Sequence, residues 1–211
     1  MKRVINLDNW NRKEHFKFFS ALDDPFWGIT TTVDFTSIYQ QSKNMEVSFF
    51  LYSVHFLLKC INATTAFKLR IENGEVVEYD KINISPTIGR EDGTFGFGFF
   101  EYDRDLSLFI ENAEKEIHRV KNSAGLSFSK DTARADVIRY SALPWFAFSE
   151  MKHAGSIQTG DSIPKISTGK LIQEKKKLLL PISISVHHGL VDGRNVAEFI
   201  QNLKDGQNNT L

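Results

Sequence analysis

The stretch His187-His188-Gly189-Leu190-Val191-Asp192-Gly193 marks a strand-to-helix junction that decides the fold of this chain. The residues before it, 178–186 (LLLPISISV), alternate in the way typical of a strand with one apolar face. A helix is expected to begin near Asp192 or Gly193, because apolar residues then recur at helical spacing: Val196, Phe199, Ile200 and Leu203. Gly206 predicts the C-terminal cap of this helix.

Two adjacent histidines at a strand end suggest chemistry. If the extended geometry continues, His187 and His188 point to opposite faces of the sheet. An imidazole titrates near neutral pH and is the usual general base for a hydroxyl or thiol. An ordinary hydrogen-bonded pair and a triad oriented by Asp192 remain alternatives. A zinc site is disfavoured, because adjacent strand residues face apart and the sequence has no Cys cluster or HExxH segment.

Composition is that of an ordinary globular protein. The 211 residues are 41% hydrophobic and 12% aromatic, enough for one sizeable core, so we predict a single domain over 1–211. Lys plus Arg equals Asp plus Glu at 26 each, which gives no overall attraction to nucleic acid or to an anionic membrane. Cys60 is the only cysteine and residues 1–8 lack a signal-peptide apolar core, so we expect a cytoplasmic location.

The longest apolar stretch, 47–61, contains several polar residues and is too short and too polar to span a membrane. It predicts a buried amphipathic helix in which Cys60 is a small core residue and His55 is structural.

The remaining pattern mixes strands and helices irregularly. Asn73-Gly74 predicts a type I′ turn between strands at 67–72 and 75–79, because both central positions need positive φ. Further helices are expected at 12–22 and 106–120, and further strands at 27–35, 95–101, 137–140 and 167–172. This order predicts an α/β two-layer sandwich, a mixed β-sheet covered on one face by helices. Residues 155–164 (GSIQTGDSIP) predict a surface loop bordering a site.

The His-His-x-x-x-Asp-Gly pattern at 187–193 resembles that of the chloramphenicol acetyltransferase family and, more distantly, the acyltransferase cores of 2-oxo-acid dehydrogenase complexes. Two further segments agree in content and order. Residues 9–16 (NWNRKEHF) are similar to the family's W-x-R-[KR]-E-H-F signature, and 141–145 (SALPW) resembles its S-x-x-P-W segment. The resemblance covers nearly the whole chain and implies the CoA-dependent acyltransferase fold.

The resemblance also implies a mechanism. His188 would take the proton of an acceptor hydroxyl, which attacks the thioester of acetyl-CoA directly, so no permanently bound cofactor is expected. Ser141 would donate to the oxyanion, and Ser167 replaces a Thr that holds an active-site water. Asp192 would form a buried ion pair with Arg12, and the base His would be oriented largely by its own backbone carbonyl.

The residues expected to bind acetyl-CoA and the acceptor differ more from the family pattern than the residues expected to carry out the reaction. Lys170 aligns with a Lys that contacts the CoA phosphates, whereas a second family Lys falls at Ser48. The acceptor pocket corresponds to aromatic residues after the N-terminal helix, Phe18, Phe19, Phe26 and Trp27. The motif interior reads GLVDGR where the family commonly has AVCDGF. The resemblance implies O-acetylation of a small hydroxyl acceptor, with chloramphenicol as the leading acceptor, by a homotrimer whose sites lie between subunits.

Three alternatives stay open. The acceptor could be another small alcohol, or the chain could be a non-catalytic trimeric binding protein of the same fold. Transfer to a thiol, as in dihydrolipoamide acyltransferases, is less favoured, because those cores normally follow a lipoyl domain and linker that this sequence lacks.

Overall fold

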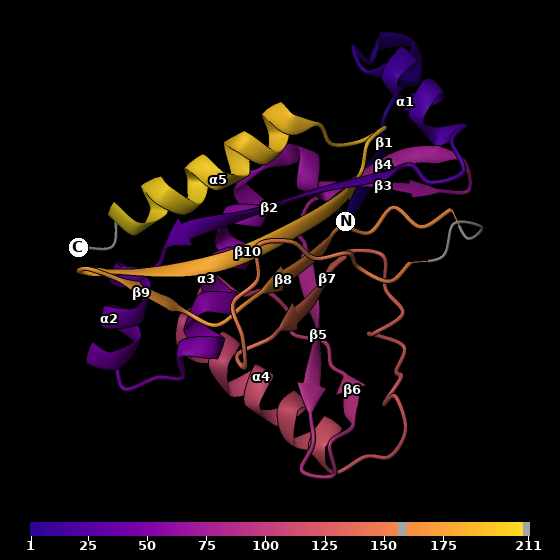
Figure 1. Cartoon of the computed structure of the whole chain (residues 1–211). Helices are drawn as coiled ribbons and strands as arrows, with labels where there is room; N and C mark the ends of the chain where they lie inside the picture. The colour runs from indigo at the N-terminus through magenta and orange to yellow at the C-terminus, as the bar shows by residue number, and fades with distance from the viewer. Residues whose placement is uncertain (156–159, 209–211) are drawn as a thin grey trace.

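The computed structural model describes residues 1–155 and 160–208 and contains a large mixed sheet, a small sheet and a layer of helices (Figure 1). In the large sheet β7 is parallel to β5 and β8, and the other neighbours are antiparallel. Its strands, in spatial order, are β2 (Phe26–Asp34), β10 (Lys177–His187), β8 (Lys165–Thr168), β7 (Val137–Ala142), β5 (Asn83–Gly89) and β6 (Phe95–Phe97). A further strand, β9 (Ile172–Glu174), pairs with β10. The predicted mixed sheet is confirmed.

The helices gather mainly on one face of this sheet. Figure 1 shows α5 running alongside β2, and α1 near the end of β10 where that strand passes into α5. The helices are α1 (Lys13–Ser20), α2 (Thr36–Asn44), α3 (Phe49–Ala63), α4 (Leu106–Lys121) and α5 (Gly193–Asn208), with short 3₁₀ turns at η1 (Leu7–Asn9) and η2 (Thr65–Lys68). None of the helices in the described ranges is long and apolar enough to cross a membrane.

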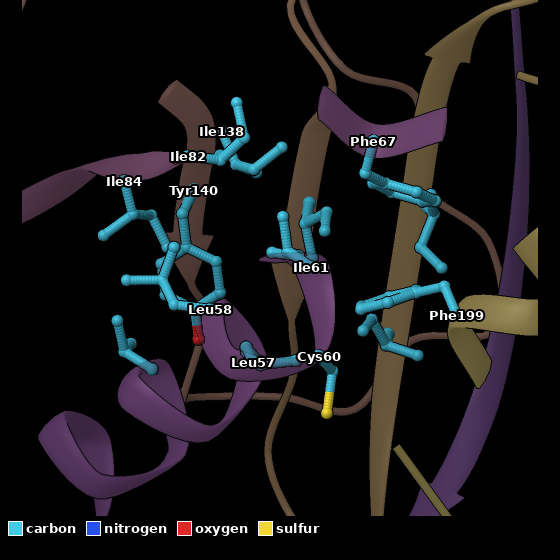
Figure 2. Packing of buried hydrophobic residues seen from close by; sticks show 14 of the residues in the cluster. Leu57, Leu58, Cys60, Ile61, Phe67, Ile82, Ile84, Ile138, Tyr140 and Phe199 are labelled. Carbon is cyan, nitrogen blue, oxygen red and sulfur yellow. The ribbon is translucent and has the colours of Figure 1, made fainter. Parts of the chain in front are cut away.

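The core forms around α3, the helix predicted from the apolar stretch 47–61. Figure 2 shows Leu57, Leu58 and Ile61 pointing into a cluster with residues of β5, β7 and α5, and each is at most 1% exposed. Cys60 is a buried core residue as predicted, and burial raises the pKa of its thiol to about 12, which makes it a poor nucleophile.

The small sheet is β1 (Lys2–Val4), β4 (Glu75–Tyr79) and β3 (Leu69–Glu72). The predicted turn is confirmed, since Asn73 and Gly74 have φ of 51° and 81°. Arg70 on β3 is fully buried and donates hydrogen bonds of 2.6–2.9 Å to four backbone carbonyls, those of Phe67, Leu69, Ala135 and Val137. This one side chain joins the small sheet to β7 of the large sheet.

The structure departs from the sequence-based expectations at several elements. The predicted strand 95–101 is regular only over β6, with Phe100 joined to Ile84 by an isolated bridge. The predicted strand 167–172 is two strands, β8 and β9. The helix α5 continues through Gly206, so the predicted cap is wrong. A Cβ at Gly206 would lie 2.9 Å from the Phe56 ring, and close packing therefore explains this glycine.

Replacing Leu58 by alanine should lower the free energy of unfolding by about 2–5 kcal/mol, because Leu58 is 0% exposed and its loss leaves a cavity in the core. Denaturant unfolding measures the change. Leu108→Ala is the matched control, since Leu108 on α4 is 44% exposed and its truncation should change stability by less than about 1 kcal/mol. Equal losses for the two variants would contradict this placement of the core.

Candidate active site

The junction predicted from the sequence is a tight turn from β10 into α5. The carbonyl of His187 accepts hydrogen bonds from the amides of Leu190 and Val191, both at 3.0 Å. The backbone here leaves little space, because a Cβ on Gly189 would lie 3.0 Å from the His187 ring. Gly193 has open space around it and no unusual φ, so of the two glycines in the turn only Gly189 is required by close packing.

The two histidines point to opposite faces of the sheet, as predicted. His187 pairs with Phe26 of β2 and meets its ring edge-on, with 5.9 Å between the centroids. His188 instead contacts Trp27, the next residue of β2, at 5.3 Å between the centroids. Successive strand residues face opposite ways, so the pair cannot share one ligand.

His187 is the buried member of the pair. It is 4% exposed, and burial lowers the pKa of its imidazole to about 4, so the ring is neutral at physiological pH. Its Nδ1 accepts a hydrogen bond from the amide of Gly189 at 3.2 Å. The ring therefore helps to hold the turn.

His188 is half-buried and held by its neighbours. Its ring lies flat on Phe19, with 3.9 Å between the centroids and 9° between the planes. Its amide donates to the carbonyl of Pro25 at 2.8 Å. Within the described ranges Nδ1 is buried without a hydrogen-bond partner, so the expected bond to its own carbonyl is not present here. Aromatic packing orients this ring.

Arg12 and Asp192 form the expected ion pair, Arg12 Nη1 to Asp192 Oδ2. The side chains are 17% and 35% exposed, so the pair is partly buried and not fully buried as expected. Arg12 Nη2 also donates to the carbonyl of His188 at 3.3 Å. The N-terminal signature and the histidine motif are thus joined by one guanidinium.

Asp192 also begins α5. Its Oδ1 accepts from the amides of Arg194 and Asn195, while the side chain of Asn195 accepts from the amide of Asp192. Burial acts to raise the pKa of Asp192, but the hydrogen bonds from Arg12 and from these amides outweigh it and leave the pKa below its usual value.

Ser141 and Ser167 lie side by side on β7 and β8. Ser141 Oγ accepts a hydrogen bond from Thr87 Oγ1 on β5 at 3.1 Å. Ser167 is fully buried, and its Oγ lies 3.0 Å from Nε2 of His153. The structure thus brings the two predicted hydroxyls together.

Within one chain these hydroxyls are remote from His188. Ser167 pairs with Ser183 on β10, so Ser141, Ser167 and Ser183 form a row across the sheet. His188 follows Ser183 by five residues, which is roughly 17 Å along an extended strand. A single copy therefore cannot place both groups on one reacting carbonyl.

Three of the four predicted pocket aromatics surround the histidines, Phe19, Phe26 and Trp27. Phe18 is 64% exposed and contacts Phe19 edge-on. Beside them, on the His187 side of the sheet, is a cleft of about 690 Å³ whose lining includes Phe26, His153, Asp161 and Lys165. Gly155, Gly160 and Asp161 of the predicted loop border this cleft, whereas residues 156–159 lie outside the described residues.

A second aromatic group, near Ser141, was missed. Phe97 of β6 pairs with Thr87 of β5, whose hydroxyl contacts Ser141, and Phe128 stacks on Phe97 at 5.4 Å. The Gly-aromatic alternation at 95–100 was the available signal, but it does not show which strand lies next to it.

Lys170 is exposed just beyond β8, where its amide donates to the carbonyl of Phe146 at 2.9 Å. Ser48 precedes the first turn of α3. In residues 1–155 and 160–208 no group of three or more His, Cys, Asp or Glu side chains is arranged to hold a metal ion.

Known proteins resemble this chain along nearly its whole length. A family model described as chloramphenicol acetyltransferase matches residues 2–204. Chloramphenicol acetyltransferase 3 of Escherichia coli is 27% identical over 208 residues, which cover 98% of this chain and 97% of that protein. A solved structure of a chloramphenicol acetyltransferase has a TM-score of 0.89 at 29% identity and covers 97% of this chain and 99% of the other.

The fold extends to more distant acyltransferases. A probable dihydrolipoamide acetyltransferase from Listeria monocytogenes has a TM-score of 0.68 at 13% identity, covering 98% of this chain and 94% of that one. The fold expected from the sequence is confirmed.

Replacing Asp192 by asparagine should lower the free energy of unfolding by roughly 1–3 kcal/mol at pH 7, between the values for exposed and buried ion pairs. Because the pKa of folded Asp192 is lowered, its contribution is fully present above the usual carboxyl pKa and is lost as the pH falls through the lowered value. The difference between wild type and variant in denaturant unfolding should therefore begin to shrink below about pH 4 and vanish below the lowered pKa.

Asp8→Asn is the control for this measurement, because Asp8 pairs with Lys13 but its side chain is 83% exposed. It should change stability less than Asp192→Asn at pH 7. A difference between wild type and Asp192→Asn that persists unchanged in acid would contradict the role of the ion pair.

Proposed function

The chain belongs to the chloramphenicol acetyltransferase family, and from this premise we propose that it transfers the acetyl group of acetyl-CoA to a hydroxyl of a small acceptor, with chloramphenicol as the leading acceptor. One observation carries the proposal. Arg12 of the N-terminal signature binds both Asp192 and the carbonyl of His188, so the two segments most typical of the family form one support beneath the base.

The reaction needs a base and an oxyanion donor. His188 takes the proton of the acceptor hydroxyl, whose oxygen attacks the thioester carbonyl of acetyl-CoA. Ser141 donates to the negative oxygen of the tetrahedral intermediate. As the intermediate collapses, the carbon–sulfur bond breaks and the protonated His188 returns its proton to the CoA thiolate. The products are the acetyl ester and CoA, and no permanently bound cofactor takes part.

The surroundings of Ser141 favour this role. Its Oγ accepts the hydrogen bond of Thr87, which leaves its own hydroxyl proton to be donated toward the substrate. A donor already held in position stabilises the developing charge without reorganisation during the reaction.

We propose a homotrimer in which each site is completed by two copies. The row of Ser141, Ser167 and Ser183 ends five residues short of His188, so a neighbouring copy must supply the histidine. Large apolar side chains near Ser141 are exposed in the single chain, Phe128 by 69% and Trp145 by 72%, which favours their cover by another subunit or by the acceptor.

The remaining assignments follow the same proposal. Lys170 would contact the CoA phosphates, and no nucleic acid or membrane partner is needed. Phe18, Phe19, Phe26 and Trp27 would line the acceptor side around His188. The chain would act as one domain in the cytoplasm, and acetylation of chloramphenicol would confer antibiotic resistance.

A different small alcohol is the second candidate acceptor. Arg194 is exposed at the start of α5, where the family commonly has Phe. This position therefore carries a positive charge that an apolar Phe does not. The presence of His188, Ser141 and Arg12 disfavours a non-catalytic binding protein. Two dihydrolipoamide acetyltransferase structures share the fold at 13% and 14% identity, and this likeness carries no argument for their substrate.

Purified protein should release CoA from acetyl-CoA when chloramphenicol is added, and His188→Ala should lower this rate by about 10²–10⁴-fold because the base is lost. A thiol-detection assay measures the rate. His118→Ala is the control, since His118 is exposed on α4, it contacts Asn122 on the same segment, and its loss should leave the rate unchanged.

The outcomes separate the alternatives. Release of CoA with another alcohol but not with chloramphenicol would change only the assigned acceptor and leave the proposed reaction in place. Equal rates for wild type and His188→Ala would overturn the catalytic assignment and favour the binding-protein alternative.

Mixing two inactive variants tests the shared site. His188→Ala and Ser141→Ala should each be nearly inactive alone, yet trimers reassembled from an equal mixture should regain activity at about a quarter of the sites, those that combine an intact Ser141 with an intact His188 from its neighbour. A mixture no more active than its components would place both residues in one subunit. The double variant mixed with either single variant is the control and should stay inactive.

A further inference from the structure

His153 lies in the segment between β7 and β8, and neither the sequence motifs nor the proposed reaction assigns it a role. Its Nε2 is 3.0 Å from Ser167 Oγ. The chain just before His153 is held in place, since Ser183 Oγ donates to the carbonyl of Met151 at 3.4 Å. The imidazole is therefore fixed over the row of hydroxyls.

Ser167 belongs to the site through its place in the sheet. It lies opposite Ser141, the proposed oxyanion donor, and these residues alternate with core residues such as Tyr140 and Ile166. Its hydroxyl faces away from the helices and toward the side where Ser141 lies. Ser167 is 0% exposed, so the direction of its hydroxyl proton is decided by its neighbours and not by bulk water.

The position of the proton on His153 follows from burial. Burial and the nearby Lys165 ammonium lower the pKa of His153, so the ring is neutral and carries one N–H. Nδ1 is buried and has no partner in the described residues. A proton on Nδ1 would be an orphaned donor, which proteins avoid more strictly than an orphaned acceptor. The proton therefore belongs on Nε2, where it is donated to Ser167.

We infer that His153 is a positioning residue that makes Ser167 a second hydrogen-bond donor of the active site. With its Oγ accepting from His153, Ser167 has its own hydroxyl proton left to donate on the side of the sheet where Ser141 lies. Thr87 acts on Ser141 in the same way from the other side. Each of the two adjacent serines thus accepts one hydrogen bond, Ser141 from Thr87 and Ser167 from His153, and is left with a proton to donate. This inference rests on the proposed acyl transfer.

Kinetics of four variants test it: His153→Leu, His153→Gln, Ser167→Ala and the His153→Leu/Ser167→Ala double. His153→Leu removes both ring nitrogens and should lower kcat about 3- to 10-fold, with KM for both substrates little changed, as expected for one lost hydrogen bond. His153→Gln retains an N–H near Nε2 and should restore most of kcat. The double variant should be no slower than Ser167→Ala, because His153 acts through Ser167.

Several outcomes would overturn the inference. These are an unchanged kcat in His153→Leu, a His153→Gln no better than His153→Leu, or losses that multiply in the double variant. A merely structural histidine would not give the rescue by Gln together with non-additivity.

A measurement independent of turnover separates this inference from the proposed function. Long-range ¹H–¹⁵N spectra of the wild-type histidine side chains should show His153 as the Nε2–H tautomer, and Ser167→Ala should shift its nitrogen resonances. An Nδ1–H tautomer overturns the inference even in an active enzyme. If no acceptor is acetylated while the Nε2–H tautomer is found, the proposed reaction fails and the hydrogen bond stands.

Discussion

The contact of Arg12 with Asp192 and with the carbonyl of His188 supports the rest of the candidate site. It joins residues 180 positions apart and fixes the N-terminal segment against the strand-to-helix turn. With that segment in place, α1 can present Phe19 flat against the His188 ring. The Asp192 carboxylate binds Arg12 and also accepts hydrogen bonds from the first amides of α5, those of Arg194 and Asn195. One carboxylate thus orders a helix start, an N-terminal segment and the backbone of the proposed base.

The part of this arrangement that could be predicted from the sequence is the part set by local periodicity. Alternation along 178–186 and helical spacing after Asp192 were enough to place His187 and His188 on opposite faces. The fold class followed from the order of such segments together with the family resemblance. Two elements were not predicted, in each case because of their local sequence. The strand β5 contains Pro86, which usually argues against a central strand, and α2 buries only Ile38 and Ser42, so it has no apolar stripe.

The contacts that refine the site could not be predicted, because they depend on register between strands far apart in sequence. Ser141 meets Thr87 only because β5 and β7 are parallel neighbours at that register, and His153 reaches Ser167 through a long connection without periodicity. The family resemblance also implied a buried Arg12–Asp192 pair, whereas Asp192 is one-third exposed. Solvent reaches that carboxylate beside α5, which places the ion pair between the surface and buried regimes.

The fully buried Arg70 has a consequence for how the chain unfolds. Its guanidinium charge is compensated by carbonyls that come from η2, from β3 and from the start of β7 with the residues just before it. If the small sheet separated alone, Arg70 would leave with it, and the buried carbonyls of Ala135 and Val137 would lose their hydrogen-bond donor. Partial opening at this boundary is thus unfavourable, and the two sheets form one cooperative unit. The N-terminal strand β1 and Ser141 on β7 are thereby lost or retained together.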